Sequence, residues 1–135
     1  MTNSTADVLS QLSAQAQLRR TTIMTNAARF GLGQVVATPR ALDVLQNHGF
    51  SAAQLLARHV TGDWGDCHPD DAALNEQALK DGSRIFSVYR LVNADVLAKT
   101  PRNKRDRCPT IWVITDAAND AGVRAVTTLL RPEDY

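Results

Sequence analysis

The stretch His59-Val60-Thr61-Gly62-Asp63-Trp64-Gly65-Asp66 gathers a histidine, a tryptophan and two carboxylates around two glycines. Glycine adopts the left-handed conformations that end helices and form tight turns. The sequence therefore predicts that Gly62 ends one helix and that the next helix begins beyond Asp66. We expect the large Trp64 ring to fill the space between these helices and the rest of the chain, so that this bend organises the domain.

The helix before the bend carries the clearest local signals in the chain. Ser51 and Gln54 form a capping box, in which each side chain accepts a hydrogen bond from the backbone N–H of the other residue. Apolar residues at helical spacing predict one buried face: Leu55, Leu56 and Val60. His59 follows at the same spacing, so it lies on or beside that face.

Two interpretations of His59 follow from this position. A histidine on a buried face is most often packed and hydrogen-bonded to a neighbouring carbonyl or carboxylate. A partly buried imidazole also has a tunable pKa, and Asp63 or Asp66 can fix its tautomer. The structural and the functional interpretation of His59 both stay open at this point.

A short strand and a helix are predicted before this unit. Residues 34–37 read Gln-Val-Val-Ala and are a strand candidate. Thr38 has the side chain of a helix cap, and Pro39 then occupies the first helical position, where its missing N–H is harmless. Gly49 supplies a left-handed stop for this helix.

A third helix is expected to begin near Pro69, with Asp66 or His68 as its cap. Aspartates follow in its first turn, where negative charge is favourable. Gly82 is expected to end the helix. Its inward face is predicted from three apolar residues: Leu74, Ala78 and Leu79.

The acidic residues near the bend also raise the question of a metal site. Four carboxylates offer the oxygen ligands that magnesium prefers: Asp63, Asp66, Asp70 and Asp71. Their spacing lacks the alternation of a calcium-binding loop. Zinc would need Cys67, His68 and Cys108 to converge with a further histidine, and no short motif predicts this. We therefore expect no metal and no cofactor.

Three strands rich in β-branched and aromatic residues are predicted in the second half of the chain: residues 84–91, 110–115 and 124–130. The expected fold is α+β, with the helices followed by a three-stranded antiparallel β-meander packed on them. Arg84 and Arg90 share one face of the first strand. They reach solvent or the acidic segment in the structural interpretation, and line a phosphate-binding concavity with Tyr89 in the functional one.

The connection between the first two strands, residues 92–109, is too long for a tight hairpin and carries a basic run. Five side chains of this run can contact a nucleic-acid backbone without reading its sequence: Lys99, Arg102, Lys104, Arg105 and Arg107. A solvated loop tip is the alternative interpretation. No aromatic residue is interleaved among them, which weakens the case for a single-strand stacking platform.

The composition is typical of one soluble globular domain, with 135 residues, a net charge of +1, 44% apolar and 21% charged residues. Without a long apolar run or a secretory leader, we expect no membrane association and a cytoplasmic location. Residues 1–30 are predicted to be a helical or mobile extension, and residues 31–135 the single α+β domain. Met24-Thr25-Asn26 repeats Met1-Thr2-Asn3, so translation from Met24 is a further hypothesis.

Four segments carry a family resemblance: HVTGDWGD at 59–66, NEQALKDGSRIFSVY at 75–89, IWVIT at 111–115 and TTLLRPEDY at 127–135. Together they resemble an uncharacterised family of small bacterial proteins found on plasmids and integrative elements. The resemblance covers roughly residues 33–135 and implies a cytoplasmic accessory protein of a mobile genetic element, without implying an activity. It also implies a short turn where this chain has residues 92–109, so the basic run looks like an insertion.

The favoured hypothesis is a non-enzymatic interaction module for a protein or nucleic-acid complex. Its surface would be formed by four residues: Asp63, Trp64, Asp66 and the carboxy-terminal Tyr135. Exposed aromatic residues on a rigid scaffold dominate the energetics of such interfaces. A protein partner is expected first, and nucleic acid, bound through residues 99–107, second.

The alternative hypothesis is a small metal-independent endoribonuclease. His59 would be its general acid or base, and Arg84 and Arg90 would bind the scissile phosphate. Tyr89 or Thr128 would assist. This chemistry requires the imidazole and both guanidinium groups to share one cleft.

Overall fold

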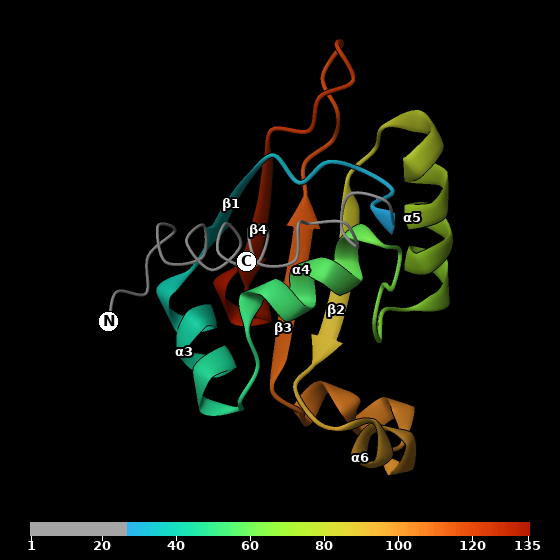
Figure 1. Ribbon diagram of the computed structural model, residues 1–135. Helices are drawn as coiled ribbons and strands as arrows, with labels where there is room; N and C mark the ends of the chain where they lie inside the picture. Colours follow the sequence, from blue (N-terminus) through green and yellow to red (C-terminus); the bar gives the residue numbers. More distant parts are fainter. Residues whose placement is uncertain (1–26) are drawn as a thin grey trace.

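The computed structural model describes residues 27–135 (Figure 1). The elements follow in the order β1 (Gln34–Ala37), α3 (Pro39–Asn47), α4 (Ala52–Val60), α5 (Pro69–Asp81), β2 (Ile85–Arg90), α6 (Ala94–Lys99), η1 (Arg102–Arg107), β3 (Thr110–Thr115), β4 (Val126–Leu130) and η2 (Pro132–Asp134), where η marks a 3₁₀ helix. The predictions for residues 1–26, including a start at Met24, lie outside the described residues. None of the described helices is long and apolar enough to cross a lipid bilayer.

The four strands form one mixed sheet in the order β1-β4-β3-β2. β2 pairs antiparallel with β3, and β3 pairs antiparallel with β4, as in the predicted meander. β1 pairs in parallel with β4, with Gln34 opposite Val126 and Ala37 opposite Leu129. The α+β class is confirmed, but the three-stranded antiparallel meander is wrong, because the 34–37 strand adds a fourth, parallel strand at the edge.

The added strand is held by backbone contacts at both of its ends. Gln34 donates its N–H to the Ala125 carbonyl at 2.8 Å, and Thr38 donates its N–H to the Leu129 carbonyl at 3.0 Å. Gly33 has a φ of 65° and lies against the backbone of residues 124–125, where a Cβ atom would overlap carbonyl oxygens. A glycine therefore lets the chain approach β4 closely enough to pair with it.

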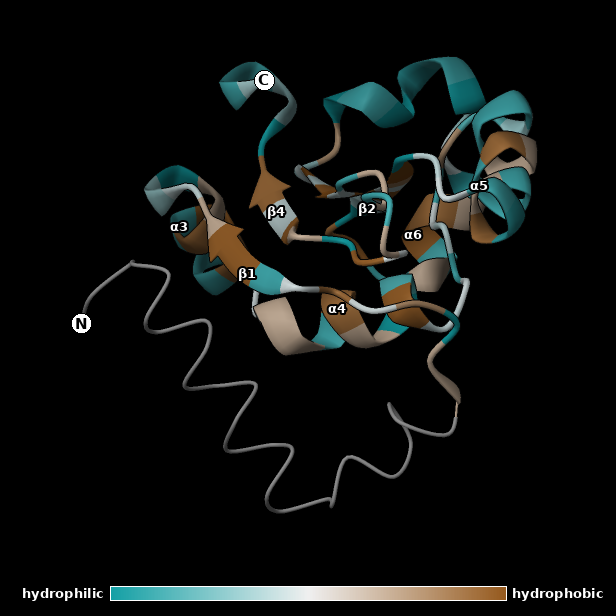
Figure 2. Cartoon of the chain, turned by 90° about the horizontal axis from the view of Figure 1, so that it is seen from above, coloured by the Kyte–Doolittle hydropathy of each residue, from teal (hydrophilic) through white to brown (hydrophobic). Residues whose placement is uncertain are grey.

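Helices α3 and α4 cover one face of the sheet (Figure 1). The register places Ser87 opposite Val113, and Tyr89 opposite Ile111, on this face. Buried residues of the two helices join Tyr89, Ile111 and Val113 in one core cluster: Ala41, Leu42, Leu45, Ala52, Leu55 and Leu56. In Figure 2 the C-terminal segment lies on the other side of the sheet from α4. The two faces of the sheet therefore have different surroundings.

The helices begin where the caps predict. In α4, the Gln54 N–H donates to Ser51 Oγ at 3.1 Å and the Ser51 N–H donates to Gln54 Oε1 at 2.7 Å, which confirms the capping box. Thr38 caps α3 with its side chain, also as predicted. Of the two candidates for α5, His68 is the cap and Asp66 is not.

Helix α5 stands beside β2 (Figure 1) and closes the outer edge of that strand. Asn75 Nδ2 donates to the Phe86 carbonyl at 2.6 Å, and the Phe86 N–H donates to Asn75 Oδ1 at 2.9 Å. Asn75 is 2% exposed, whereas Leu74, predicted to face inward, is 64% exposed. The prediction for Leu74 is wrong because α5 turns Asn75 toward the unpaired backbone of the edge strand. Ala78 is buried, as predicted.

Asn75→Ala is expected to lower the free energy of unfolding by about 2 kcal/mol, because it leaves one donor and one acceptor of Phe86 unpaired in a partly buried position. Urea unfolding measures this change. Leu74→Ala on the same helix is the control and should change stability little, since Leu74 is exposed. Equal losses in the two variants would contradict the edge-closing role of Asn75.

The packed part of the chain begins before Gly31, where the predicted domain starts. Arg29 forms an ion pair with Glu76 of α5 at 3.0 Å. Phe30 packs against the second core cluster, which contains Trp64. Two residues predicted to belong to the N-terminal extension thus contact the bend region and α5.

Candidate functional site

His59 lies in a chain of hydrogen bonds between α4 and the sheet, and it is fully buried. Its Nδ1 is 2.6 Å from Ser87 Oγ and its Nε2 is 2.8 Å from Thr115 Oγ1. Thr115 Oγ1 is in turn 2.7 Å from Thr127 Oγ1. Thr127 donates its hydroxyl hydrogen to the Leu32 carbonyl at 2.7 Å.

The Leu32 carbonyl sets the direction of this chain because it can only accept. Thr127 donates to it, so the Thr127 oxygen accepts from the Thr115 hydroxyl, and Thr115 accepts from His59 Nε2–H. In a neutral ring, His59 Nδ1 then accepts from the Ser87 hydroxyl. The hydrogen-bond chain therefore selects the Nε2–H tautomer for the neutral ring, with both of its nitrogens satisfied.

The electrostatics of this position agree with a neutral ring. Burial, together with the positive charge of Arg124, lowers the pKa of His59 from 6.5 to about 3. A fully buried imidazole with this pKa neither meets a substrate nor exchanges a proton near neutral pH. The structure supports the structural interpretation of His59, with hydroxyl groups as its partners in place of Asp63 or Asp66.

The other residues of the endoribonuclease hypothesis do not join His59. Arg84 precedes β2 and Arg90 ends it, so the two guanidinium groups start from opposite ends of the strand. His59 contacts Ser87, which lies on the other face of the sheet from Arg90. Tyr89 is buried and donates its hydroxyl to a backbone carbonyl of the bend at 2.6 Å. The single cleft that the endoribonuclease hypothesis requires is not formed by these residues.

Trp64 is turned into the domain and is 7% exposed. Its indole stacks on Phe30 with ring centroids 6.2 Å apart, and it meets the His59 ring edge-on at 6.1 Å. Its Nε1–H donates to Glu76 Oε2 at 2.8 Å. The prediction that Trp64 forms an interaction surface is wrong, because the ring is packed between α5 and the sheet. The packing role predicted for the bend is confirmed.

Backbone hydrogen bonds join the bend to β2. The Val88 N–H donates to the Trp64 carbonyl at 3.1 Å, and the Asp66 N–H donates to the Val88 carbonyl at 2.7 Å. Gly65 lies between these bonds with a φ of 74°, and a Cβ atom there would overlap the Val88 carbonyl. The second glycine of the bend is therefore required for the chain to lie against the strand.

Arginines hold the two carboxylates of the bend. Asp63 accepts from Arg58 Nε at 2.6 Å. Asp66 accepts from Arg90 Nε at 2.9 Å and from Arg105 Nη1 at 2.7 Å, and its side chain is only 7% exposed. Burial alone would raise the pKa of Asp66, but the hydrogen bonds and charges of both arginines hold it below its usual value. The prediction that Asp66 lies on an interaction surface is wrong, because it is the anchor of an internal ion-pair network.

The face of the sheet turned away from α3 and α4 carries a chain of aromatic rings. We define this open face, named for the groove above it, by five residues of β2 and β3: Phe86, Val88, Arg90, Thr110 and Trp112. Val88 and Thr110 are buried in the strands, and the other three side chains are partly exposed. Phe86 and Trp112 meet edge to face with ring centroids 5.1 Å apart, and Trp112 meets Tyr135 at 5.7 Å. Tyr135 is 73% exposed. The structure thus brings the predicted surface residue Tyr135 together with two rings of the sheet.

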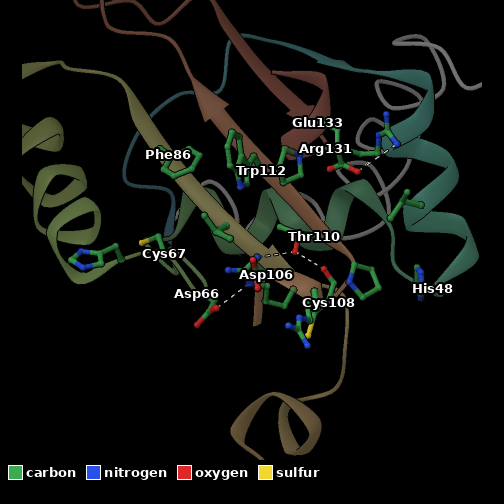
Figure 3. Close-up of a pocket in the computed structure, with 17 residues that line it drawn as sticks. His48, Asp66, Cys67, Phe86, Asp106, Cys108, Thr110, Trp112, Arg131 and Glu133 are labelled. Carbon is green, nitrogen blue, oxygen red and sulfur yellow. Dashed lines mark hydrogen bonds and ion pairs between the residues drawn. The ribbon is translucent and has the colours of Figure 1, made fainter. Parts of the chain in front are cut away.

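A groove of about 750 Å³ lies over the open face (Figure 3). Figure 3 shows Phe86 and Trp112 side by side on the strands, with Arg131 and Glu133 of the C-terminal segment next to Trp112. The start of α5 and the end of η1 complete the lining. The charged residues contributed by η1 and the C-terminal segment are Asp106, Arg107, Arg131 and Glu133.

The basic run is folded. One of its basic side chains belongs to the ion-pair network, and the others are exposed to solvent. It forms the end of α6 and the 3₁₀ helix η1. Arg105 is partly buried, where it binds Asp66 and donates to the Thr100 carbonyl at 3.0 Å. The other four side chains of the predicted backbone-binding set are exposed: Lys99, Arg102, Lys104 and Arg107. Arg107 lies at the groove, so the run flanks the open face.

Phe86 and Trp112 are the candidate residues that sequence reasoning missed. Trp112 alternates with the buried residues Ile111 and Val113, so it points to the opposite face of the strand. Phe86 stands in the same relation to its neighbours on β2. The signal was available in the sequence, as a large ring out of phase with the apolar face on each of two strands.

Metal binding gains no support from the described residues. Between residues 27 and 135, no three His, Cys, Asp or Glu side chains are grouped so that they could hold a metal ion. Cys67 and Cys108 are free thiols, and both line the groove. Burial, with a contribution from the negative charge of Asp71, raises the pKa of the Cys67 thiol.

No protein-family model, curated protein or solved structure matches this chain. The resemblance to proteins of plasmids and integrative elements therefore stays a prediction.

Proposed function

We propose that the protein is a non-enzymatic interaction module that binds single-stranded nucleic acid across the open face of its sheet. The observation that carries the proposal is the chain of rings formed by Phe86, Trp112 and Tyr135 beside a basic 3₁₀ helix. Bases of any identity stack on aromatic side chains, while cationic side chains follow the phosphates. The rings of the sheet supply the aromatic component that the basic run lacks in the sequence.

The distribution of charge favours nucleic acid over a protein as the ligand. Three of the acidic groups near the rings are paired, since Asp66 binds two arginines and Glu133 and Asp134 share Arg131. In contrast, η1 exposes three basic side chains against the single Asp106: Arg102, Lys104 and Arg107. The uncompensated charge next to the rings is therefore positive, which attracts a phosphate backbone.

The sequence favours a protein partner, but the surface predicted to bind it is largely not exposed. Trp64 is buried and Asp66 is paired, so only Tyr135 and the half-exposed Asp63 remain from that predicted surface. Tyr135 now belongs to the chain of rings. A strand-binding module also suits the accessory role on a mobile genetic element that the family resemblance implies.

Binding of a labelled single-stranded oligo-U or oligo-dT, followed by fluorescence anisotropy, tests the proposal. Trp112→Leu and Tyr135→Ala are each expected to weaken binding by about 1–3 kcal/mol, or roughly 5- to 150-fold in Kd, because each removes a stacking surface. Leu74→Ala and Val123→Ala remove exposed apolar side chains elsewhere and should leave Kd unchanged. No binding by the wild type, or equal binding by all four variants, would overturn the proposal.

A further inference from the structure

A second cavity, of about 530 Å³, lies between the bend and the segment that connects β2 with β3. Part of its lining is apolar and comes from Val92, Ala94 and Leu97. Four arginines also line it: Arg58, Arg90, Arg102 and Arg105. It shares Asp66, Val88 and Arg90 with the groove over the open face, so the two spaces adjoin.

The charges around this cavity are not balanced. Asp66 is the one acidic residue in its described lining, and it is shared by Arg90 and Arg105. Asp63 pairs with Arg58 from outside the lining. Arg102 makes no ion pair or side-chain hydrogen bond with any residue of 27–135. Four positive charges thus meet two negative ones, and two positive charges remain uncompensated.

The same arginines keep most of their hydrogen-bond donors unused. A guanidinium group carries five N–H donors. Arg58, Arg90 and Arg105 each use two of them in hydrogen bonds within the domain. A phosphate monoester carries close to two negative charges near neutral pH and presents three acceptor oxygens. It therefore matches both the excess charge and the planar donor sets of this cavity.

We propose that this cavity binds a phosphate monoester dianion. When a strand lies on the open face, the ligand is the terminal phosphate of that strand, and this part rests on the proposed function. An internal phosphodiester carries a single charge, so a terminal monoester neutralises the cavity better. A free nucleoside monophosphate offers the same group, with the apolar wall of Val92, Ala94 and Leu97 beside it.

Isothermal titration calorimetry on the full chain tests the site with four probes: unphosphorylated oligo-U, the same oligomer phosphorylated at its 5′ end or at its 3′ end, and uridine 5′-monophosphate. Phosphorylation of one end is expected to lower Kd by about tenfold. Arg102→Ala should remove that gain. Lys104→Ala removes the same charge from the same 3₁₀ helix outside the cavity lining, and it should keep the gain.

The four probes distinguish between a strand end and a free nucleoside monophosphate as the source of the phosphate group. A gain on one phosphorylated oligomer that depends on Arg102 supports the strand end as the ligand. Binding of uridine 5′-monophosphate that depends on Arg102, without a gain on either oligomer, supports the site but overturns the strand end as its ligand. If the oligomers bind equally and the monophosphate does not bind, the site is overturned while the proposed function stands. If only the monophosphate binds, the proposed function fails and the site stands.

Discussion

Replacing Trp64 with alanine is expected to lower the free energy of unfolding by about 3–5 kcal/mol. The indole is buried against Phe30 and His59 and donates a hydrogen bond to Glu76, so its removal leaves a cavity where the bend, α5 and the sheet meet. A loss of this size is a large part of the stability of a small domain. Thermal or urea unfolding of the full chain measures it.

Two further variants serve as comparisons for the loss of stability in Trp64→Ala. Trp64→Phe keeps a ring beside Phe30 but loses the hydrogen bond to Glu76, so we expect an intermediate loss. Trp112→Leu removes part of a partly buried ring and should cost less than Trp64→Ala. A change below about 1 kcal/mol in Trp64→Ala would show that the indole does not organise this corner.

Stability is expected to fall by about 2 kcal/mol between about pH 7.5 and pH 5 because His59 resists protonation. The pKa of His59 is lowered from 6.5 to about 3 in the folded protein. The unfolded chain therefore binds a proton that the folded chain does not bind, as the pH falls below 6.5. The stability that the neutral ring contributes is fully present above pH 6.5 and is lost progressively as the pH falls below this value. Urea unfolding at a series of pH values measures the slope.

His59→Gln separates this effect from other titrations. The amide stays neutral, so the variant should be less stable at neutral pH and show a flatter pH dependence above pH 5. Carboxylates such as Asp63 and Asp66 contribute to the pH dependence of stability at lower pH. Burial alone would raise their pKa values, but their contacts with arginines hold these values below the usual range. A wild type with flat stability, or the same slope in His59→Gln, would contradict the buried neutral ring.

The helices could be predicted from the sequence because their signals are local. Ser51 and Gln54 lie three residues apart and cap α4 whatever the rest of the chain does. The orientation of α5 could not be predicted in the same way. Its buried residue Asn75 bonds to the backbone of Phe86, and only the position of β2 tells that this partner exists. Leu74 was therefore predicted to face inward because it is apolar, but it is exposed.

The order of the sheet depends on contacts that are distant in sequence. Residues 34–37 were recognisable as a strand, but their partner is β4, about ninety residues away. Hydrophobic alternation says which face of a strand is buried and does not say which strand lies beside it. The glycine at position 33, which approaches the backbone of residues 124–125, is a sign of this pairing only once the pairing is known.

The candidate site was predicted in part. The bend was expected to organise the domain, and its Trp64 and His59 do pack there. The same residues also suggested a binding surface. A tryptophan beside two aspartates can be an exposed binding residue or a buried core residue, and only its burial in the fold decides between the two. Phe86 and Trp112 could not be singled out from the sequence by residue type, because β-branched and aromatic residues are ordinary in strands. Their significance comes from their position on the face of the sheet that α3 and α4 do not cover, where they line the groove.

NMR of the two indole N–H groups during titration with single-stranded oligo-U tests most directly whether the open face binds a strand. Trp112 lies on the open face and Trp64 is buried with its N–H bonded to Glu76, so one signal reports on the open face and the other on the packed bend. Assignment comes from Trp112→Phe. We expect the Trp112 signal to move with saturation while the Trp64 signal stays in place. Saturating binding with an unmoved Trp112 signal, or no binding at all, would contradict strand binding by the open face.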